Sequence, residues 1–425
     1  EIPRAGGVGL ATGAGYRTVR RRWHPPDMLA RGLRWLGSNV LVPAAITVAL
    51  FAFLEGSCRV VGRLRTGSWP VTAQESATRF TRRVGQGYRT HPFLAVAGRP
   101  GAVIRVPGHE VRFNSLGIRG PEVAMPKPPG RFRVVCEGGS TTFDLLAAND
   151  ATTWPARLGA LLGPGADVVN GGFPGWTSVQ SLVALELRDV DLAPDLVVVF
   201  SGINDLQPAG HIPFFRDYSV GHGEILPRVL GATPAPLPLV ARSVLVEWLR
   251  GTLGLRGSSV ESDGYAPAWD WTGGTRRGRM PEEAVEVYAR NLRSTAAVAR
   301  AFGARTLFVA QAARLRKGRE AWDRTYLESW TPGLSADGYL DGVARYDAAA
   351  RALAAEGCAE FVDPFAGEGF ADDDFADPVH FSDAGSAKFA GRIGEEVARI
   401  RRPGAAAPAA NIQPPAAGSA ATRKK

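Results

Sequence analysis

The sequence has too few cysteines for a disulfide framework. Cys58, Cys136 and Cys358 are the only three among 425 residues, and their spacing matches neither paired half-cystines nor zinc ligands. Cys136 would end one predicted strand and Cys358 would precede the last one, so we expect both to be unbridged, buried, small apolar side chains. No other pattern points to a metal or an organic group, and we expect no cofactor.

Lysine is also scarce, so arginine carries nearly all of the net charge of +9. No basic run is interleaved with aromatic residues, which argues against a nucleic-acid partner. An anionic membrane surface or an acidic polymer matches this charge better. With 45% hydrophobic and 21% charged residues and no internal repeats, the chain can bury the core of one large domain that carries appendages.

Charged residues are missing from the twenty positions 35–54. A helix of that length is about 30 Å long and crosses the hydrocarbon core of a bilayer. Asn39 and Pro43 are unusual in such a helix, and a buried core helix is the alternative. We predict a membrane anchor over 35–54, preceded by an Arg- and Gly-rich segment, residues 1–34, without periodicity.

The flanking charges indicate how this anchor is oriented. Six arginines lie within about twenty residues on its N-terminal side and three on the other, which favours the N-terminus inside and the large domain outside. No small-residue cleavage site follows, so an uncleaved anchor is favoured over a signal peptide. Glu55 also spoils a lipoprotein processing site at Cys58. Because a short basic leader follows Met28, we hypothesise that translation natively begins there.

A serine stands directly after a Val-rich run that is typical of a buried strand. The run begins at Phe132 and ends in Gly138 and Gly139, and Ser140 follows. Glycines at the carboxyl end of a parallel strand let the chain turn sharply and let a ligand come close. The motif is not the G-x-S-x-G elbow, because Thr142 stands where the second glycine should be. Taken alone, it fits a turn without a ligand equally well.

Three later stretches add to this motif. They cover residues 168–177, 195–205 and 377–385, and the first two follow predicted strands. Together the four stretches resemble, in order and spacing, the four sequence blocks of the SGNH hydrolases, also called the GDSL esterase/lipase superfamily, over roughly residues 130–400. The resemblance suggests a membrane-anchored bacterial member.

The resemblance implies a role for each matching residue. Ser140 would be the nucleophile, His380 the general base, and Asp377 the carboxylate that orients His380. The oxyanion would be bound by the backbone N–H groups of Ser140 and Gly175 and by the side-chain amide of Asn204. The chain departs from the family's first block, which often reads Gly-Asp-Ser, because Gly139 replaces the acidic residue. This change is expected to affect substrate contacts or loop rigidity, since that position lies outside the triad.

Strands that alternate with helical patterns predict parallel βαβ units. We therefore expect an α/β fold, a three-layer α/β/α, flavodoxin-like domain with a five-stranded parallel sheet. Strands are expected near 132–136, 167–170, 195–200, 305–310 and 360–363, and helices near 152–163, 177–189, 282–302, 340–356 and 384–400. The predicted domains are a lead-in segment over 55–130, the hydrolase domain over 131–400 with an insertion at 206–280, and a disordered Ala/Pro-rich tail over 401–425.

The insertion carries a segment with an apolar helical face. Our first interpretation is that this helix covers the hydrophobic core, and the second is that it forms a lid or touches a membrane. That face holds Val240, Val244, Leu245, Trp248 and Leu249. An aromatic group in the same insertion would stack on a sugar or fill the insertion's own core. Its members are Tyr265, Trp269 and Trp271.

Several further polar residues receive structural interpretations. The segment 114–120, Asn-Ser-Leu-Gly-Ile-Arg-Gly, looks like one found in a subset of bacterial SGNH proteins, and we interpret it as a glycine-supported turn that packs against the sheet. Asn170 is expected to cap the turn after its strand, and Asp205 to support Asn204. The remaining polar candidates, which we interpret as solvated or surface residues, are Asp372, Asp373, Asp374, His211 and His222.

These observations predict a serine esterase that hydrolyses a small acyl ester, an acetyl group on a cell-surface carbohydrate fitting best. Two alternatives stay open. One is an O-acyltransferase that uses the same triad to pass the acyl group to a polysaccharide hydroxyl. The other is a non-catalytic, carbohydrate-binding member of the fold, which has no need of all five predicted site residues.

Overall fold

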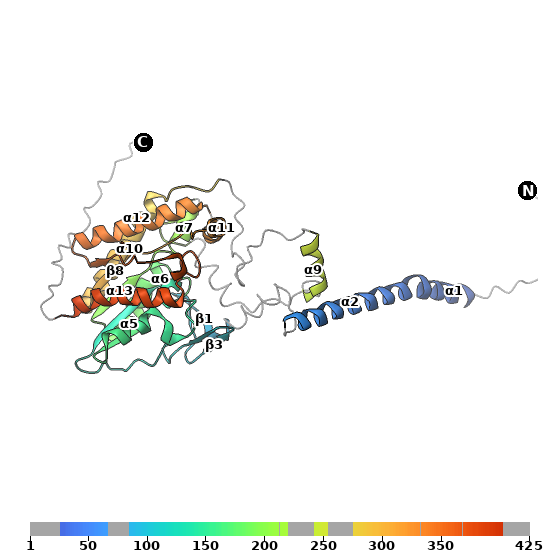
Figure 1. Ribbon diagram of the computed structural model, residues 1–425, viewed down its shortest axis with the longest axis horizontal. Helices are drawn as coiled ribbons and strands as arrows, with labels where there is room; N and C mark the ends of the chain where they lie inside the picture. Colours follow the sequence, from blue (N-terminus) through green and yellow to red (C-terminus); the bar gives the residue numbers. More distant parts are fainter. Residues whose placement is uncertain are drawn as a thin grey trace, which may run out of the picture. The chain divides into compact units, whose positions relative to one another are not determined.

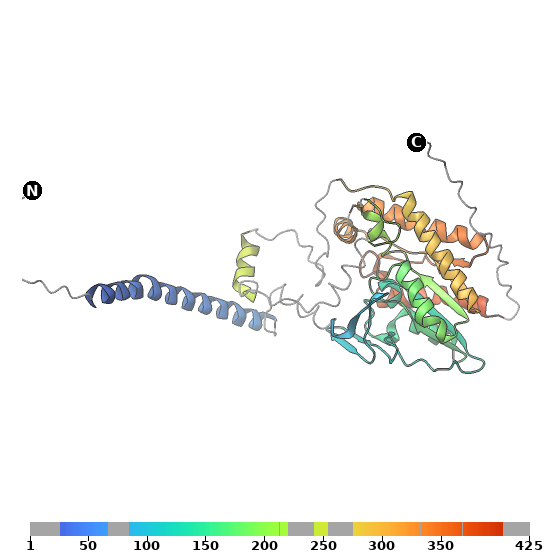
Figure 2. The same cartoon turned by 180° about the vertical axis from the view of Figure 1, so that it is seen from behind.

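The computed structural model describes residues 26–66, 85–211, 213–219, 242–253, 275–331, 333–367 and 369–402. The chain divides into two compact units. The smaller, here called the N-terminal unit, consists of Glu1–Val71 and Ser243–Gly254, and the remaining residues form the larger unit. Figure 1 and Figure 2 show the elements of both units from opposite sides.

The larger unit is built around a five-stranded parallel sheet in the order β6-β5-β7-β8-β9. The strands are β5 (Phe132–Gly138), β6 (Ala166–Asn170), β7 (Leu196–Phe200), β8 (Arg305–Val309) and β9 (Glu360–Val362). All five agree with the ranges predicted from sequence. The first strand of this sheet in chain order, β5, lies between β6 and β7, so loops from three adjacent strand ends meet at the carboxyl edge of β5.

Helices cover both faces of the sheet and make the three predicted layers. They are α5 (Trp154–Leu162), α6 (Ser178–Ala184), α10 (Glu282–Ala301), α12 (Ala336–Ala355) and α13 (Asp383–Arg401). Side chains of α5 and α13 share one core cluster, and side chains of α10 and α12 share the other. Figure 1 shows α5 and α13 side by side on one face of the sheet. The central strand β7 is buried on both faces, because its side chains alternate between the two clusters.

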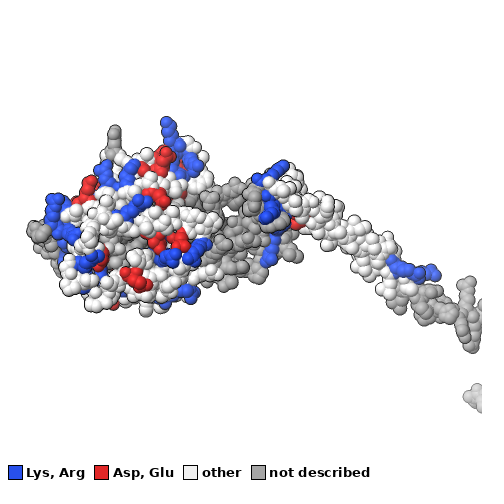
Figure 3. Space-filling view, turned by 60° about the horizontal axis from the view of Figure 1, so that its bottom comes forward, with Lys and Arg blue, Asp and Glu red and all other residues white. Residues whose placement is uncertain are grey.

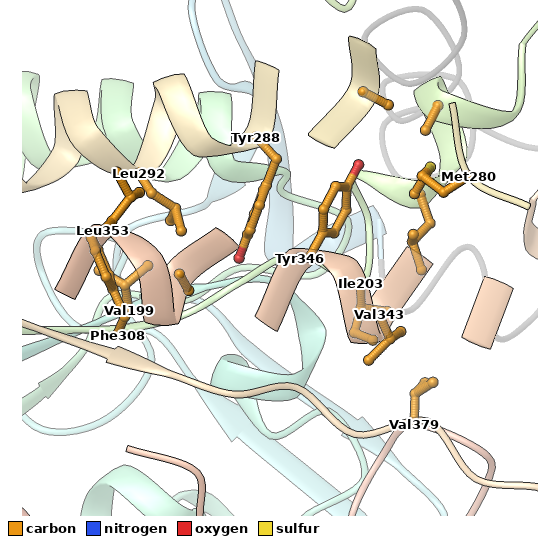
Figure 4. Close-up of a cluster of buried hydrophobic side chains, with 14 of the residues drawn as sticks. Val199, Ile203, Met280, Tyr288, Leu292, Phe308, Val343, Tyr346, Leu353 and Val379 are labelled. Carbon is orange, nitrogen blue, oxygen red and sulfur yellow. The ribbon is translucent and has the colours of Figure 1, made fainter. Parts of the chain in front are cut away.

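Two tyrosines join the helical layer to the end of β7. The rings of Tyr288 and Tyr346 stack with their centroids 4.1 Å apart, as Figure 4 shows. The Tyr288 hydroxyl donates to the carbonyl of Ser201, directly after β7, over 2.6 Å. This contact fixes the strand end from which the third sequence block continues.

Some helix boundaries differ from the prediction for a packing reason. The structure begins α12 at Ala336, whereas sequence placed its start near 340. Gly338 and Gly342 lower helix propensity, but a Cβ at Gly338 would lie 2.2 Å from the Arg277 carbonyl and one at Gly342 2.5 Å from Leu206. Close packing therefore favours glycine within this helix.

The lead-in segment folds into two antiparallel hairpins that sequence did not predict. Strand β1 (Tyr88–His91) pairs with β2 (Ala95–Gly98), and β3 (Val103–Val106) pairs with β4 (His109–Arg112). Their apolar side chains form a third cluster together with Phe143 and Trp176, residues that follow β5 and β6. The indole N–H of Trp176 donates to the carbonyl of Val96 over 2.9 Å. The hairpins thus pack on the loops that carry the predicted site.

The N-terminal unit contains one long apolar helix. Helix α1 (Pro26–Leu36) continues through a π-helical turn, Gly37–Leu41, into α2 (Val42–Thr66). Among the described residues this is the one helix long and apolar enough to cross a membrane, and none of its most apolar stretch is buried. The helix extends beyond the predicted 35–54 at both ends, where charged residues return.

The two residues that fitted this helix poorly are accommodated locally. Pro43 follows the π-helical turn, where the backbone already departs from α-helical hydrogen bonding. The side-chain amide of Asn39 donates to the carbonyl of Trp35 over 3.0 Å. A polar group bonded to its own helix is cheaper to place in an apolar surrounding than an unpaired one.

Candidate active site

Two glycines set the position of Ser140 at the end of β5. A Cβ at Gly138 would lie 2.1 Å from the carbonyl oxygen of Phe200, and one at Gly139 would lie 2.4 Å from the amide nitrogen of Asn204. The backbone therefore passes too close to β7 and its loop for any larger residue. Ser140 then begins the short helix α4 (Ser140–Phe143) with a side chain that is almost fully buried. The acidic residue that often precedes the family's serine would not fit at Gly139 unless Asn204 moved.

The structure brings Ser140, His380 and Asp377 into one hydrogen-bonded chain. The Nε2 atom of His380 lies 2.8 Å from the Ser140 Oγ, and its Nδ1 lies 2.7 Å from Asp377 Oδ2. The other Asp377 oxygen, Oδ1, accepts the backbone N–H groups of Val379 and His380 over 2.9 and 2.8 Å. The three-residue spacing thus closes a tight turn in which the carboxylate holds both the backbone and the ring of His380.

Two supports outside that turn fix its position. Ser382 caps the N-terminus of α13, and its hydroxyl accepts the Gly385 N–H over 3.2 Å. The hydroxyl of Tyr326, on α11 (Glu320–Trp330), donates to Asp377 Oδ2 over 3.1 Å. Sequence reasoning missed α11 and Tyr326. The spacing of Trp322, Tyr326 and Trp330 four residues apart is the signal that could have found this helix.

Burial and charge set the protonation of the pair. Burial alone would raise the pKa of Asp377, but His380 and the two backbone N–H groups hold that pKa below its ordinary value. Burial likewise opposes protonation of His380, yet the charges of Asp377 and Asp144 raise the pKa of His380 above its ordinary 6.5. Asp144, the residue directly after α4, accepts the Trp154 N–H over 2.7 Å, and burial raises the pKa of Asp144 to about 6.

The residues expected to bind an oxyanion lie in the loops that flank Ser140. Gly175 has a φ of 82° in the loop after β6, a conformation that favours glycine. Asn204 follows β7, and its Nδ2 donates to the carbonyl of Trp176 over 2.9 Å. An amide carries two N–H donors, so this bond leaves the second one for another acceptor. The loop before Gly175 is held against the Ser140 turn, because the Phe173 N–H donates to the Gly138 carbonyl over 3.0 Å.

Asp205 is buried next to Asn204 and ties two loops together. Its carboxylate accepts the Ser178 N–H over 2.9 Å, the Ser178 hydroxyl, and the Tyr218 hydroxyl over 3.1 Å. Burial raises the pKa of Asp205 to about 6. These contacts join the loop that carries Asn204 to the first turn of α6, which is the kind of support expected for Asp205.

Asn170 does not cap its turn, and this prediction is wrong. The Asn170 Nδ2 donates to the carbonyl of Phe143 over 3.2 Å, and the Oδ1 that would make an Asx turn has no partner among the described residues. The α4 helix is too short to satisfy its last carbonyls internally. Asn170 therefore serves α4, the helix that begins with Ser140.

Arg119 reaches the same helix end, which sequence reasoning missed. The segment around it is a glycine-supported turn, as expected, with Gly117 at a φ of 75°. The fully buried Arg119 side chain donates from Nη1 to the carbonyls of Phe143 and Asp144, each over 2.9 Å, and from Nε to Asp150 over 2.8 Å. A basic side chain between two glycines before the first block is the signal that could have suggested a buried partner.

The remaining candidates lie elsewhere. The interpretation of Asp374 as a solvated residue is wrong, because its side chain is buried; it pairs with Lys388 over 2.5 Å. Asp372 pairs with Arg314 over 3.3 Å. The ring of His211 lies 3.0 Å from the side chain of Gln207. Cys136 is buried and Cys358 partly so, and neither is bridged. Five of the residues singled out from the sequence lie outside the described ranges, namely His222, Val240, Tyr265, Trp269 and Trp271.

The candidate site lies within the part of the chain that matches a known protein family. A model of the GDSL-like lipase/acylhydrolase family matches residues 136–388, a range that contains Ser140, Gly175, Asn204, Asp377 and His380. No curated protein matches the chain.

Solved structures of low sequence identity are similar to the chain. A catalytic mutant of an acetylxylan esterase from Geobacillus stearothermophilus has 16% identity and a TM-score of 0.37, over 63% of this chain and 94% of that one. A lipase/acylhydrolase from Enterococcus faecalis has 16% identity and a TM-score of 0.35, over 65% and 100%. A GDSL-like lipase from Bacteroides thetaiotaomicron has 16% identity and a TM-score of 0.34, over 65% and 92%.

Proposed function

Because the chain belongs to the GDSL-like lipase/acylhydrolase family and is an ester-hydrolysing enzyme, we propose that Ser140, His380 and Asp377 are its catalytic triad. The hydrogen-bonded chain from Ser140 Oγ through His380 to Asp377 carries this proposal. A nucleophile, a base in contact with it and a group that orients the base are the parts that acyl transfer requires.

The geometry supports a defined sequence of proton transfers. With its own proton on Nδ1, directed at Asp377, His380 accepts the Ser140 hydroxyl proton on Nε2 while Oγ bonds to the ester carbonyl carbon. The carbonyl oxygen becomes negatively charged, and the C–O bond to the alcohol breaks as His380 returns the proton to the leaving alcohol. Water then takes the place of the alcohol, and its oxygen bonds to the carbonyl carbon as His380 removes a proton. The bond to Ser140 Oγ breaks as His380 returns that proton to Oγ, and the acyl group leaves as a carboxylic acid.

The charge on the oxygen would be stabilised by the N–H groups of Ser140 and Gly175 and by the amide of Asn204. These donors come from the ends of β5, β6 and β7, which are neighbours in the sheet. Each such donor is worth about 3–4 kcal/mol in the transition state. The raised pKa of His380 suits it to return a proton to a leaving alcohol near neutral pH.

We further propose that the long apolar helix over α1 and α2 anchors the enzyme in a membrane with the larger unit outside. Figure 3 shows the continuous helix over α1 and α2 as an almost uncharged rod with basic side chains near both ends. A reporter active only outside the cytoplasm, fused after residue 400, should be active, since arginines are more numerous before the helix than after it. Activity of a cytoplasmic-only reporter at the same point would refute this orientation.

The proposed substrate is a small acyl ester, an acetyl group on a cell-surface carbohydrate. An enzyme held outside the membrane meets surface polymers, which supports the carbohydrate part. The test measures release of p-nitrophenol from acetate, butyrate and octanoate esters by the full chain, with Ser140→Ala as the matched control. We expect the acetate ester to be preferred and Ser140→Ala to be inactive. Activity retained by Ser140→Ala would exclude the triad.

Transfer to a sugar is distinguished in the same assay. With a polysaccharide or oligosaccharide acceptor present, an O-acyltransferase would release p-nitrophenol faster and yield an acetylated sugar that mass spectrometry detects. A hydrolase would yield free acetate at an unchanged rate. A binding module without catalysis would give neither product.

A further inference from the structure

A carboxylate marks the end of the apolar part of α2, where it is held by a second helix. Glu55 directly follows the uncharged positions 35–54. Its Oε1 accepts the Val244 N–H over 3.0 Å and pairs with Arg59 over 2.8 Å. Its Oε2 accepts the Ser243 hydroxyl and the Leu245 N–H over 2.8 and 2.9 Å.

The second helix, α9 (Val244–Thr252), is therefore capped by a residue from the anchor. The first N–H groups of a helix have no partner within it, and a carboxylate satisfies them and matches the helix dipole. Both helices belong to the N-terminal unit, although about 190 residues separate them in the chain. The predicted insertion thus returns the chain to its anchor at Glu55.

The apolar face of α9 is only partly covered by α2. Leu245 is 7% exposed, whereas Trp248, Leu249 and Leu253 on the same face are 58%, 41% and 66% exposed. The opposite face carries Glu247 and Arg250. The interpretation of this face as core cover is wrong for Trp248 and Leu249, because neither is buried. A helix of this kind, with one apolar and one charged face, suits a membrane–water interface.

Orientation and charge agree with that setting. In Figures 1 and 2 α9 stands at a steep angle to the axis of α2. If α2 crosses the bilayer, α9 runs along the bilayer surface at the level of Glu55, the first charged residue after the apolar positions 35–54. The two ranges 55–66 and 242–253 together contain more arginine than glutamate. Their net positive charge complements the phosphate groups of lipids. Basic side chains gather at this end of α2 in Figure 3.

We propose that α9 is an interfacial membrane helix, with Trp248, Leu249 and Leu253 directed to the acyl chains and Arg250 to the headgroups. The exposed apolar face of α9 is thus covered by an anionic lipid bilayer. The proposal rests on α2 being the membrane anchor, and it makes the anchor part of the folded protein. Removing α2 would take away the cap of α9, which is a reason to keep it uncleaved.

The test places an environment-sensitive fluorophore on either face of α9 in the full chain. Cys58 and Cys358 are replaced by serine and the buried Cys136 is kept. Leu249→Cys and Arg250→Cys are labelled with nitrobenzoxadiazole, because these neighbours lie about 100° apart around the helix axis, one on the apolar side and one on the charged side. The proteins are reconstituted in phosphatidylcholine vesicles with phosphatidylglycerol, with or without doxyl-labelled lipid. Flotation of the vesicles first shows whether the protein is anchored, and ester hydrolysis shows that it is folded.

We expect the label at position 249 to be blue-shifted and quenched by doxyl lipid about twofold or more compared with position 250. Equal, water-like emission at both positions in protein that floats would overturn the proposal and leave the anchor intact. A blue shift without quenching by doxyl lipid would also overturn it, because protein would then cover the face. Protein that does not float would refute the anchor and this proposal together, whatever its esterase activity.

The role of Glu55 is tested in the same system. Glu55→Ala removes the acceptor for the Val244 and Leu245 N–H groups and leaves only the Ser243 hydroxyl, which accepts the Val246 N–H over 3.1 Å. Glu55→Gln keeps one oxygen. We expect the quenching at position 249 to be lost in Glu55→Ala and partly kept in Glu55→Gln, with flotation unchanged. Unchanged quenching in Glu55→Ala would show that α9 does not depend on the anchor.

Discussion

Replacing Asn204 by alanine separates a catalytic from a structural role for its amide. In the structure the Asn204 Nδ2 makes one hydrogen bond, to the Trp176 carbonyl over 2.9 Å. Losing such a bond destabilises a protein by about 0.5–1.5 kcal/mol. If the second N–H binds the oxyanion, its loss is felt mainly in the transition state, and kcat should fall about 10²–10³-fold with little change in KM.

The two effects appear in different measurements, so one purified variant gives both. Steady-state hydrolysis of p-nitrophenyl acetate reports the loss in kcat, and thermal unfolding reports the loss in stability. Asn149→Ala is the matched control, because the Asn149 side chain caps the turn over 150–152 and hydrogen-bonds to none of the proposed site residues. Its loss should cost about 1 kcal/mol without affecting turnover.

One outcome would remove Asn204 from the proposed oxyanion site. If Asn204→Ala is destabilised to the same degree as Asn149→Ala and both turn over substrate normally, the amide serves only the Trp176 contact. The closeness of the Asn204 amide to Gly139 would then be a packing constraint. A loss in kcat without a matching loss in stability would support the donor role.

Four further changes test the rest of the site. Ser140→Ala should abolish covalent labelling by a fluorophosphonate, and labelling that persists would place the nucleophile elsewhere. Asp144→Asn removes a charge that raises the pKa of His380, so the acid limb of the kcat/KM profile should move to lower pH; an unmoved limb would contradict this coupling. Arg119→Lys keeps the charge but loses contacts to the α4 carbonyls, so kcat should fall at nearly constant KM; a change in melting temperature alone would make the role structural. Burial raises the pKa of Glu137 well above its ordinary 4.5, so the folded state keeps a proton that the unfolded chain releases. The free energy of unfolding should therefore fall by up to about 1.4 kcal/mol per pH unit above pH 4.5, until the folded pKa is reached. Glu137→Gln should flatten this slope in melting curves.

The sheet could be predicted from sequence because its strands are short, Val-rich runs buried on both faces. Helices with clear end signals were also predictable, as with α10, which begins after Pro281 at two glutamates and ends before Gly303. The hairpins β1–β4 were not, because four-residue strands with mixed exposure lack a clear period. Their role as cover for Phe143 and Trp176 depends on contacts distant in sequence.

For the site, sequence could predict the groups that meet but not what holds them. Block order pointed to Ser140 and His380, which lie 240 positions apart and come within 2.8 Å. The contacts of Asn170 and Tyr326 could not be predicted, because an amide or a phenol has many possible local partners. Only the fold decides which carbonyl or carboxylate lies within reach.

The contacts at the end of α4 show why such supports are needed. A helix of four residues leaves its last carbonyls without internal partners, and Ser140 stands at its first position. Arg119 from the lead-in segment and Asn170 from β6 both donate to the carbonyl of Phe143. The position of the proposed nucleophile therefore depends on Arg119, which lies in a segment before the first sequence block, as well as on the strand that carries Ser140.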